Sequence, residues 1–396
     1  MKRAGTRDDS TALTVSLPRE LAVYTRTPQR WRSGCGVEVL RDGEAAFPAM
    51  IAAIEAATKS VLFATYILVA DATGNRFKDA LVARAKAGVA ARVMYDAVGS
   101  FGLPESFIQE LRVAGVEVVS FNPIALWRQR YRLSHRDHRK ILVVDDAVAF
   151  TGGINISDDY AAASEGGGGW HDMHCRVTGP VVLDIARMFR RTWHRIGGPK
   201  FPPISPARSG TPNGDAFTRL LDNTRLRQRG VVRRAYLHVI RSARKSILIE
   251  NAYFLPDRAL RRALTRAARR GVDVRIIVPG HNDVRMVGWA SLYVCRRLTR
   301  LGVQVLRWRG PMMHAKMATI DAAWSTIGSY NFDAQSRFSN LELTVEMLHP
   351  PTAHTLVNVF ESNVPNCDPF TEDVWKALPV WIKVLAFICF RLRRFL

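Results

Sequence analysis

Short apolar runs alternate with amphipathic stretches along most of the chain. The segments AATKSVLFATYIL around Ser60 and RSARKSILIENAYFLP around Ser246 each predict the end of a helix followed by a buried strand. Further helical stretches end in glycine, which favours the left-handed conformation that closes a helix, and a short β-rich run follows each one. These glycines are Gly88, Gly115, Gly271 and Gly302. Helices that alternate with strands predict an α/β fold with mixed sheets flanked by helices.

The predicted elements form two matching sets in the same order. The strand segments, the glycine-capped helices and two further segments that begin at His138 and His314 recur after 176 to 187 residues. Four collinear matches indicate a duplicated unit with small loop insertions. The stretch GGPKFPPISPARSGTPNG at residues 197–214 is rich in proline, glycine and serine, and predicts a linker between the copies. The other predicted parts are a variable N-terminal segment (1–35), a first half (36–196), a second half (215–375) and a C-terminal tail (376–396).

The segments HRKILVVDDAVAFTGGIN, from His138, and HAKMATIDAAWSTIGSYN, from His314, carry the candidate chemistry. In each segment a lysine, Lys140 or Lys316, follows the histidine by two residues and an apolar run comes next. If the run is a strand, the histidine and the lysine point to the same face, because side chains alternate along a strand. Cleavage of a phosphodiester requires such a pair: a group of near-neutral pKa, and a cation that stabilises charge on the phosphoryl oxygens.

Two further residue types recur in each copy. Asp145 and Asp321 complete a His-x-Lys-x4-Asp motif and are included among the candidate catalytic residues. Because each lies at an odd offset from its histidine, we expect it to point to the opposite strand face and to support rather than react. Asn155 and Asn331 each follow their histidine by 17 residues, after small residues that allow close approach of the backbone to a phosphate. Their amides can donate hydrogen bonds to its oxygens.

Together these segments resemble the duplicated signature of the phospholipase D superfamily. From about Val37 to Glu346 the chain resembles the bacterial cardiolipin synthase branch, including VEVLRDGEAAFPAMIAAIEAA, HRDHRKILVVD and RVTGPVV. The resemblance implies two phospholipase D-like halves related by a pseudo-twofold axis, with one active site between them where both histidines face one phosphate. It implies that one histidine forms a phosphohistidine while the other exchanges protons with the leaving and entering alcohols. It also implies that no metal and no cofactor is needed.

Residue by residue, the resemblance implies that His138 is the nucleophile and His314 the general acid and base, although near-equivalent halves leave this order open. The groups that would hold the phosphoryl oxygens are Lys140, Lys316, Asn155, Asn331 and Ser329. Asp172 in WHDMHCRV and Glu342 in SNLELTVE match the acid that hydrogen-bonds a catalytic imidazole. The first half carries Gly153 where a serine is frequent, so a hydroxyl contact to phosphate is expected to be missing there.

Composition narrows the partners and the compartment. Hydrophobic residues make up 47% of the chain, which excludes a globally disordered protein. Lys and Arg number 57 against 35 acidic residues, a net charge of +22 that favours nucleic acid or acidic lipid as a partner. Five isolated cysteines argue against a disulfide framework or a zinc site. The N-terminus lacks the apolar core of a signal peptide, so we expect a protein that is not exported.

The tail favours lipid over nucleic acid. As a helix, LPVWIKVLAFICFRLRRFL from Leu378 places Trp381, Val384 and Ile388 on one apolar stripe, and arginines cluster at its end. Its uncharged core is too short to span a bilayer but suits an interface beside anionic head groups. The alternative is a C-terminal helix that packs on the domain core. A basic-aromatic stretch at residues 126–140 suits lipid head groups and a nucleic-acid backbone equally.

We therefore predict a cardiolipin synthase-like phosphatidyltransferase that moves a phosphatidyl group from phosphatidylglycerol, or phosphatidylethanolamine, onto phosphatidylglycerol. It is expected at an anionic phospholipid membrane, as a peripheral protein on the cytoplasmic face of the bacterial inner membrane, with no partner chain needed to complete the site. The alternatives are a hydrolytic phospholipase D, a nuclease or DNA phosphodiesterase of the same superfamily, and a non-catalytic membrane-binding module.

Overall fold

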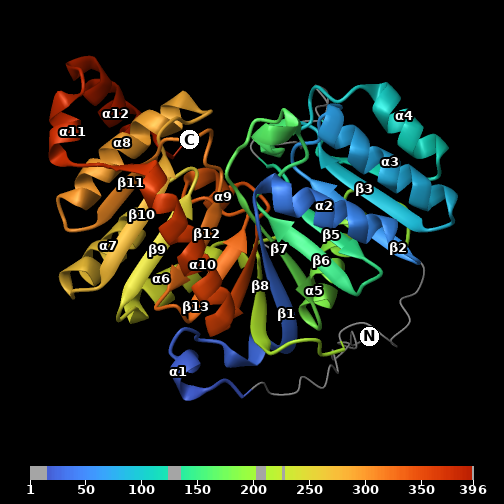
Figure 1. Cartoon of the computed structure of the whole chain (residues 1–396), viewed down its shortest axis with the longest axis horizontal. Coiled ribbons are helices and arrows are strands. Elements are labelled where there is room, and N and C mark those ends of the chain that lie inside the picture. Colours follow the sequence, from blue (N-terminus) through green and yellow to red (C-terminus); the bar gives the residue numbers. More distant parts are fainter. Residues whose placement is uncertain (1–15, 124–134, 202–210, 225–227, 395–396) are drawn as a thin grey trace, which may run out of the picture.

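The computed structural model describes residues 16–123, 135–201, 211–224 and 228–394. Within these ranges, fifteen strands form one mixed sheet in the order β15-β11-β10-β9-β12-β13-β14-β8-β1-β7-β6-β5-β2-β3-β4, with helices on both faces (Figure 1). Half of the predicted linker (202–210) and the first part of the basic-aromatic stretch, to residue 134, lie outside the described residues.

The bounds of the elements follow the chain. The first half contains β1 (Arg32–Arg41), α2 (Asp42–Glu55), β2 (Ser60–Thr65), α3 (Ala72–Lys86), β3 (Ala90–Asp96), α4 (Glu105–Val113), β4 (Glu117–Phe121), β5 (Ile141–Val144), β6 (Val148–Gly152), β7 (Met173–Thr178) and α5 (Val181–Arg195). The second half contains β8 (Ala216–Asp222), α6 (Val231–Ser242), β9 (Ser246–Asn251), α7 (Arg258–Arg269), β10 (Asp273–Pro279), α8 (Arg285–Thr299), β11 (Gln304–Trp308), β12 (Lys316–Ile320), β13 (Trp324–Gly328), α9 (Ala334–Phe338), β14 (Leu343–Leu348) and α10 (Pro350–Asn363). The ends of the described chain add α1 (Arg19–Ala22), β15 (Cys367–Pro369), α11 (Glu372–Ala377) and α12 (Val380–Leu392).

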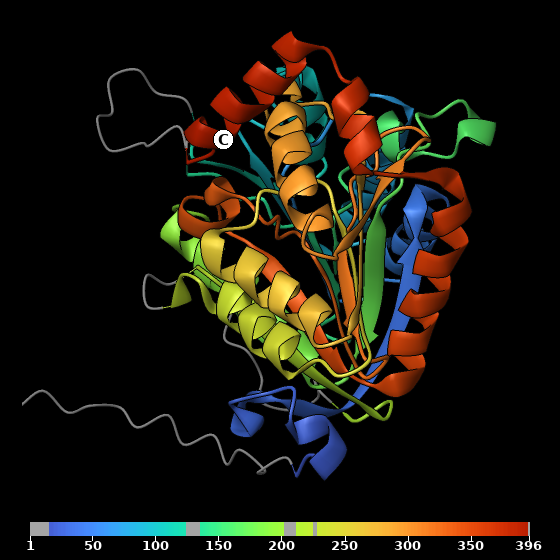
Figure 2. The ribbon, with the colours of Figure 1, turned by 90° about the vertical axis from the view of Figure 1, so that its left-hand side faces the viewer.

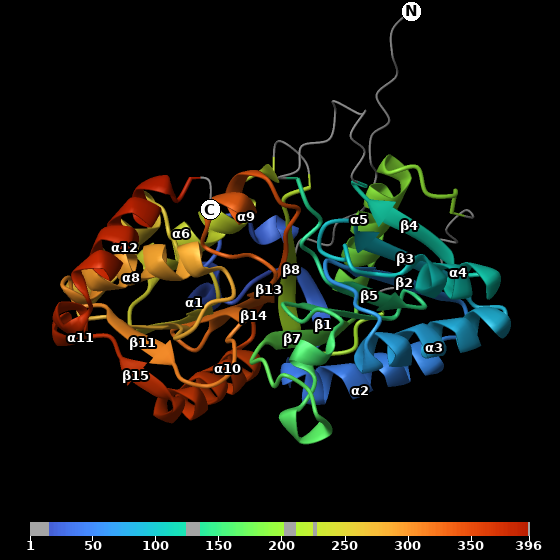
Figure 3. The same ribbon diagram turned by 90° about the horizontal axis from the view of Figure 1, so that it is seen from above.

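The strand order confirms the predicted duplication. Seven strands of the first half run β1-β7-β6-β5-β2-β3-β4, and the second half repeats this order as β8-β14-β13-β12-β9-β10-β11. Strands β2, β3 and β4 pair in parallel, as do their counterparts β9, β10 and β11, whereas the other pairs are antiparallel. β1 and β8 meet antiparallel at the centre, so the two halves are related by a pseudo-twofold axis and share one sheet (Figure 3).

Three hydrophobic clusters hold the layers together. One lies under α2, α3 and α4 in the first half, and another under α6, α7 and α8 in the second. Figure 2 shows the second half with α6, α7 and α8 on one face of its strands and α10 on the other. The third cluster joins the halves, because α5, α10 and strands of both copies contribute to it. The glycines predicted to cap helices, Gly88, Gly115, Gly271 and Gly302, have φ between +85° and +92°, as expected of left-handed caps.

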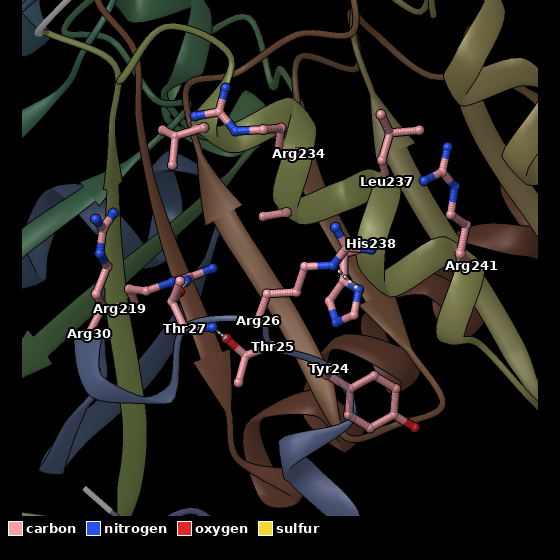
Figure 4. A pocket seen from close by; sticks show the side chains of 12 residues that line it. Tyr24, Thr25, Arg26, Thr27, Arg30, Arg219, Arg234, Leu237, His238 and Arg241 are labelled. Carbon is pink, nitrogen blue, oxygen red and sulfur yellow. Dashed lines mark hydrogen bonds between the residues drawn. The ribbon is translucent and has the colours of Figure 1, made fainter. Parts of the chain in front are cut away.

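The described residues before β1 pack on the second half rather than on the first. Leu21, Tyr24 and Trp31 belong to the hydrophobic cluster of the second half. The Tyr24 hydroxyl donates to Asp321 Oδ2 at 2.8 Å. A pocket of about 300 Å³ opens between this segment, β8 and α6 (Figure 4). Because Tyr24 lines it and binds Asp321, this pocket lies at the end of β12 that is remote from His314.

The C-terminal helix α12 packs on α8 through a narrow face and leaves a wide apolar face exposed. Ala386, Cys389 and Phe390 are buried, and the ring of Phe390 lies 4.7 Å from that of Tyr293 in α8. The exposed apolar side chains are Val380, Trp381, Val384, Phe387, Ile388 and Leu392. The helix therefore both packs on the core and presents the predicted stripe. Nowhere in the described ranges is a helix both long and apolar enough to cross a membrane.

Candidate active site

The two motifs meet because each is bound to the other half of the chain. His138 lies just before β5, and its backbone N–H donates to Leu341 O at 3.0 Å. His314 lies just before β12, and its backbone N–H donates to His171 O at 2.7 Å. Leu341 and His171 each precede an acid at the start of an inner strand, β14 or β7. The duplication thus places each histidine against the acid-bearing strand of the opposite half.

The acids are exchanged between the halves. Nδ1 of His138 lies 3.3 Å from Oε2 of Glu342 and 3.2 Å from the carbonyl oxygen of Ser329. Nδ1 of His314 lies 2.8 Å from Oδ2 of Asp172. Both carboxylates are fully buried, so each fixes an imidazole that carries its proton on Nδ1. Nε2 of both rings has no hydrogen-bond partner among the described residues, and is therefore available to a reacting phosphate.

Two buried lysines make the site strongly cationic. Lys140 Nζ donates to the carbonyl oxygen of His138 at 2.8 Å, and Lys316 Nζ donates to that of His314. Burial and the charge of Lys316 lower the pKa of Lys140 to about 7, and burial lowers the pKa of Lys316 to about 8. Burial and these ammonium groups also hold the pKa of His314 well below its usual range. A bound anion would relieve this repulsion, so the arrangement favours a phosphate.

The two acids differ in their electrostatics. Burial acts to raise the pKa of Glu342, but His138 and the hydroxyls of Ser329 and Ser336 outweigh it and lower that pKa. Burial raises the pKa of Asp172 to about 6, although Lys316 opposes this effect. The two sides of the pseudo-twofold site are therefore chemically unequal.

Sequence comparison decides the family. A profile of the family described as "Cardiolipin synthase, PLD-like domain" matches residues 50–192 and 236–364, more than half of the chain. The chain belongs to the phospholipase D-like cardiolipin synthase family. It is 33% identical to a cardiolipin synthase of Alkalihalophilus pseudofirmus over 351 residues. This alignment covers 88% of this chain and 70% of the relative. It is also 33% identical to cardiolipin synthase A of Pseudomonas entomophila over 366 residues. That alignment covers 91% of this chain and 76% of the relative.

A solved structure supports the fold of this phospholipase D-type enzyme. Phosphatidylserine synthase of Haemophilus influenzae superposes with a TM-score of 0.66, at 14% identity, covering 91% of this chain and 95% of that one. At this identity the likeness concerns the fold alone. It agrees with two phospholipase D-like halves that share one sheet.

In this family member the motif aspartates lie away from the imidazoles. Oδ1 and Oδ2 of Asp145 accept from the amides of Thr58, Lys59 and Ser60, each at 2.8 Å, at the far end of β5. Asp321 accepts from three amides at the equivalent place before β9. Both aspartates have φ of +54° in the three-residue turns that join β5 to β6 and β12 to β13. Their inclusion among the catalytic candidates is therefore corrected: they lie in turns beyond the strand ends and fix those turns, rather than lying on the opposite strand face.

Ser329 also differs from its expected role in the cardiolipin synthase site. Its hydroxyl donates to Glu342 and accepts from the amide of Leu343 at 3.1 Å, so it orients the acid rather than facing a phosphate. On the other side, a side chain at Gly153 would place a Cβ 2.1 Å from Asp172 Oδ1. Gly153 therefore makes room for the shorter acid, which explains the missing serine.

The two asparagines are not equivalent either. Asn155 Nδ2 donates to the hydroxyl of Tyr160 at 2.8 Å, and Asn155 Oδ1 accepts from the amide of Ile67 at 3.2 Å. The Tyr160 hydroxyl lies 3.0 Å from Nδ1 of His314, so Asn155 acts on this histidine through Tyr160. The buried Oδ1 of Asn331 has no partner in the described structure. Asn331 thus keeps an unpaired side-chain oxygen among the described residues, whereas Asn155 is bound through both of its side-chain polar atoms.

Sequence reasoning missed Tyr160, Ser336 and two residues that clamp the acids. Asp42 Oδ1 accepts from the amide of Asp172 at 3.0 Å, and Asn223 Oδ1 accepts from the amide of Glu342 at 2.7 Å. Asp42 directly follows β1 and Asn223 directly follows β8, so their matched positions in the repeat were the available signal. No group of three or more His, Cys, Asp or Glu side chains suited to a metal ion occurs in the described ranges.

Proposed function

We propose that this protein is a phosphatidyltransferase that forms cardiolipin through a phosphohistidine intermediate. The observation that carries the proposal is the pair of buried imidazoles, each oriented by an acid of the opposite half and flanked by a buried ammonium group. The donor is phosphatidylglycerol or phosphatidylethanolamine, and the acceptor is the glycerol hydroxyl of phosphatidylglycerol. Membership of the cardiolipin synthase family supports these substrates.

In the first half-reaction, Nε2 of His138 attacks phosphorus while Glu342 holds the Nδ1 proton. The bond between phosphorus and the head-group oxygen breaks, and Nε2 of His314 gives its proton to the leaving alcohol. Asp172 stabilises the imidazolium form of His314 that this step requires. Lys140 and Lys316 stabilise the charge on the phosphoryl oxygens.

The second half-reaction reverses these roles. His314 takes the proton of the acceptor hydroxyl, whose oxygen attacks phosphorus as the bond to His138 Nε2 breaks. Hydrolysis would follow the same steps with water as acceptor, so the product distinguishes a transferase from a phospholipase D. Two histidines within one chain make a partner chain unnecessary for this cycle.

We also propose that the protein docks on an anionic membrane, at the cytoplasmic face of the bacterial inner membrane, through α12 and its surroundings. Trp381, Val384 and Ile388 of α12 are exposed, whereas Ala386, Cys389 and Phe390 form the buried face. Arg393 and Arg394 at its end line a pocket of about 630 Å³ together with Arg337 and Phe338 of α9. The same pocket is lined by Tyr330, next to Asn331, so cationic and apolar groups gather beside the candidate site. This combination suits anionic head groups over an apolar layer.

The substrate is tested with the purified full chain on vesicles of phosphatidylglycerol and, separately, on single-stranded DNA. Release of glycerol with formation of cardiolipin is expected, and His138→Ala and His314→Ala should each abolish it. His354→Ala is the matched control, because His354 is exposed on α10. Phosphatidic acid without cardiolipin would replace the transferase by a hydrolase, and DNA cleavage without lipid turnover would overturn the lipid assignment. Acid-labile phosphate on His138 would identify the nucleophile; label on His314 would reverse the two roles.

Docking is tested by Trp381→Ser combined with Val384→Ser, which alters the exposed face of α12 and spares the face that packs on α8. Co-sedimentation with anionic vesicles should fall at least tenfold for this variant. Substitution of two exposed residues remote from the tail, Phe101→Ser and Val113→Ser, should leave it unchanged. Equal losses in both variants would contradict docking through α12.

A further inference from the structure

A buried imidazole lies between two carboxylates directly behind Asp172. Nδ1 of His171 is 2.6 Å from Asp42 Oδ1, and its Nε2 is 3.1 Å from Glu250 Oε2. Asn363 Nδ2 donates to the second oxygen of Glu250 at 2.8 Å. His171 is 2% exposed and Glu250 is fully buried. The same Asn363 Nδ2 lies 3.0 Å from Nε2 of His171. Because a carboxylate oxygen also faces each ring nitrogen, the geometry favours a ring that is protonated on both nitrogens.

This cluster ties the two halves together. His171 and Asp42 belong to the first half, whereas Glu250 lies on β9 and Asn363 ends α10 in the second. Arg41 closes the outer side, because its guanidinium binds Asn363 Oδ1 at 2.8 Å and Asp42 Oδ2 at 3.4 Å. The charged members therefore balance one another across the interface.

Two routes connect the cluster to His314. Asp42 Oδ1 accepts from the amide of Asp172 at 3.0 Å, and the amide of Asp42 donates to the carbonyl oxygen of Asp172 at 2.9 Å. Asp172 in turn holds Nδ1 of His314. The carbonyl oxygen of His171 accepts directly from the backbone of His314. Displacement of His171 would thus move both the histidine and its acid.

At the matching positions, all within the described residues, the second copy has no such cluster, so the cluster is specific to one histidine. Leu341 takes the place of His171, since its carbonyl oxygen accepts from His138. The neutral Asn223 takes the place of Asp42. Ala64 takes the place of Glu250. In the sheet, Ala64 is paired with Ile141, three residues after His138, just as Glu250 is paired with Met317, three residues after His314. The charged cluster therefore supports only the His314–Asp172 pair.

We propose that His171, held as an imidazolium by Asp42 and Glu250, is a positioning residue that keeps Asp172 ionised and aimed at His314. It thereby specialises His314 for proton exchange. The inference rests on the proposed function, in which one histidine must alternate between its protonated and neutral forms against a carboxylate that stays charged. A neutral Asp172 could not stabilise the imidazolium form of His314.

The electrostatics agree with this role. Asp172 is faced by Lys316, Lys140, His314, His174 and His171, and the His171 charge is one of those that lower the pKa of this buried acid against the effect of burial. Burial acts to lower the pKa of His171, but the hydrogen bonds that the ring donates to Asp42 and Glu250 outweigh it and raise this pKa to about 10, so the imidazolium persists at neutral pH. Two uncharged groups also lie beside the ring: the Asn363 amide, whose Nδ2 is 3.0 Å from Nε2, and the indole of Trp308, 5.3 Å away.

The test is the pH dependence of kcat for His171→Gln, which removes the charge and keeps a hydrogen-bonding side chain. The acidic limb of the profile should move up by about one pH unit, with KM for phosphatidylglycerol vesicles unchanged, because loss of a nearby cation raises the pKa of Asp172. His171→Arg, which restores a cation, should recover the wild-type profile at least in part. Asp42→Asn perturbs the cluster from its solvent-exposed side and should move the limb in the same direction.

A uniform loss of kcat at every pH in both His171→Gln and Asp42→Asn, or an unmoved acidic limb, would overturn the proposal. NMR titration of the protein labelled with ¹⁵N-histidine provides a readout that needs no turnover. The resonances of His314 should titrate differently in His171→Gln, while those of His138 should not change. If the wild type fails to turn over lipid but this selective change occurs, the proposed function is wrong and the coupling stands; the reverse result rejects the coupling alone.

Discussion

Replacement of Asp145 by alanine should destabilise the fold and spare the chemistry. Its carboxylate accepts hydrogen bonds from the amides of Thr58, Lys59 and Ser60 and from the Thr58 hydroxyl, all at 2.8 Å. A hydrogen bond to a charged group contributes about 1.5–3 kcal/mol, but water replaces part of each one here because the turn is partly exposed. Alanine also adds roughly 1 kcal/mol of strain at a φ of +54°. We expect a loss of about 3 kcal/mol in the free energy of unfolding.

The assay is urea unfolding of Asp145→Ala and of Asp145→Asn. Asparagine tolerates a positive φ and keeps one acceptor oxygen, so Asp145→Asn should lose less free energy of unfolding. Partial burial acts to raise the pKa of Asp145, but these hydrogen bonds outweigh it and lower that pKa. The stabilisation is therefore complete above the unfolded value of about 3.9 and disappears as the pH falls through the folded value. At urea concentrations below the unfolding transition, the kcat of Asp145→Ala should stay within about threefold of wild type. A fall in kcat of a hundredfold or more with unchanged stability would refute this account.

Three other outcomes are expected. Lys140→Met should lower kcat about a hundredfold through loss of charge stabilisation, and Lys140→Arg should recover part of it above pH 7, where the guanidinium stays charged; kinetics at pH 8 check this. Glu342→Gln should change the ¹⁵N resonances of His138 and leave those of His314 intact, whereas pairing within one half predicts the opposite. The raised pKa of His171 stabilises the fold fully below pH 6.5 and ceases to do so as the pH rises through about 10, so thermal unfolding should show an alkaline decline that His171→Gln lacks.

The sequence predicted the duplicated fold because the repeat is visible in residue order. Apolar runs, glycine caps and matched spacings identified the strands and helices of both copies without any knowledge of their contacts. Parity along β5 did not apply to Asp145, because this residue lies in the turn after the strand. The single sheet was not predicted, because the joining of β1 to β8 depends on how the copies pack.

The cross-pairing of acids and histidines could not be derived from order either. Asp172 follows His138 in the same half and yet binds His314, a choice made by the interface between the copies. Ser329 was expected to face phosphate, because a sequence does not show that its hydroxyl lies beside Glu342. His171 carried no motif, and only its position between two buried carboxylates reveals it.

Glu342 lies 204 positions after its partner His138, and Asp172 lies 142 before His314. A ribosome that has released the whole first half has therefore made an intact His-x-Lys-x4-Asp motif whose imidazole has no carboxylate to orient it. Under the proposed mechanism, we expect chemistry to begin only when the chain has grown past Glu342 and the second half has folded against the first. A truncated product, or a message cut short, would thus bear the signature of the enzyme and leave the lipids around it uncleaved.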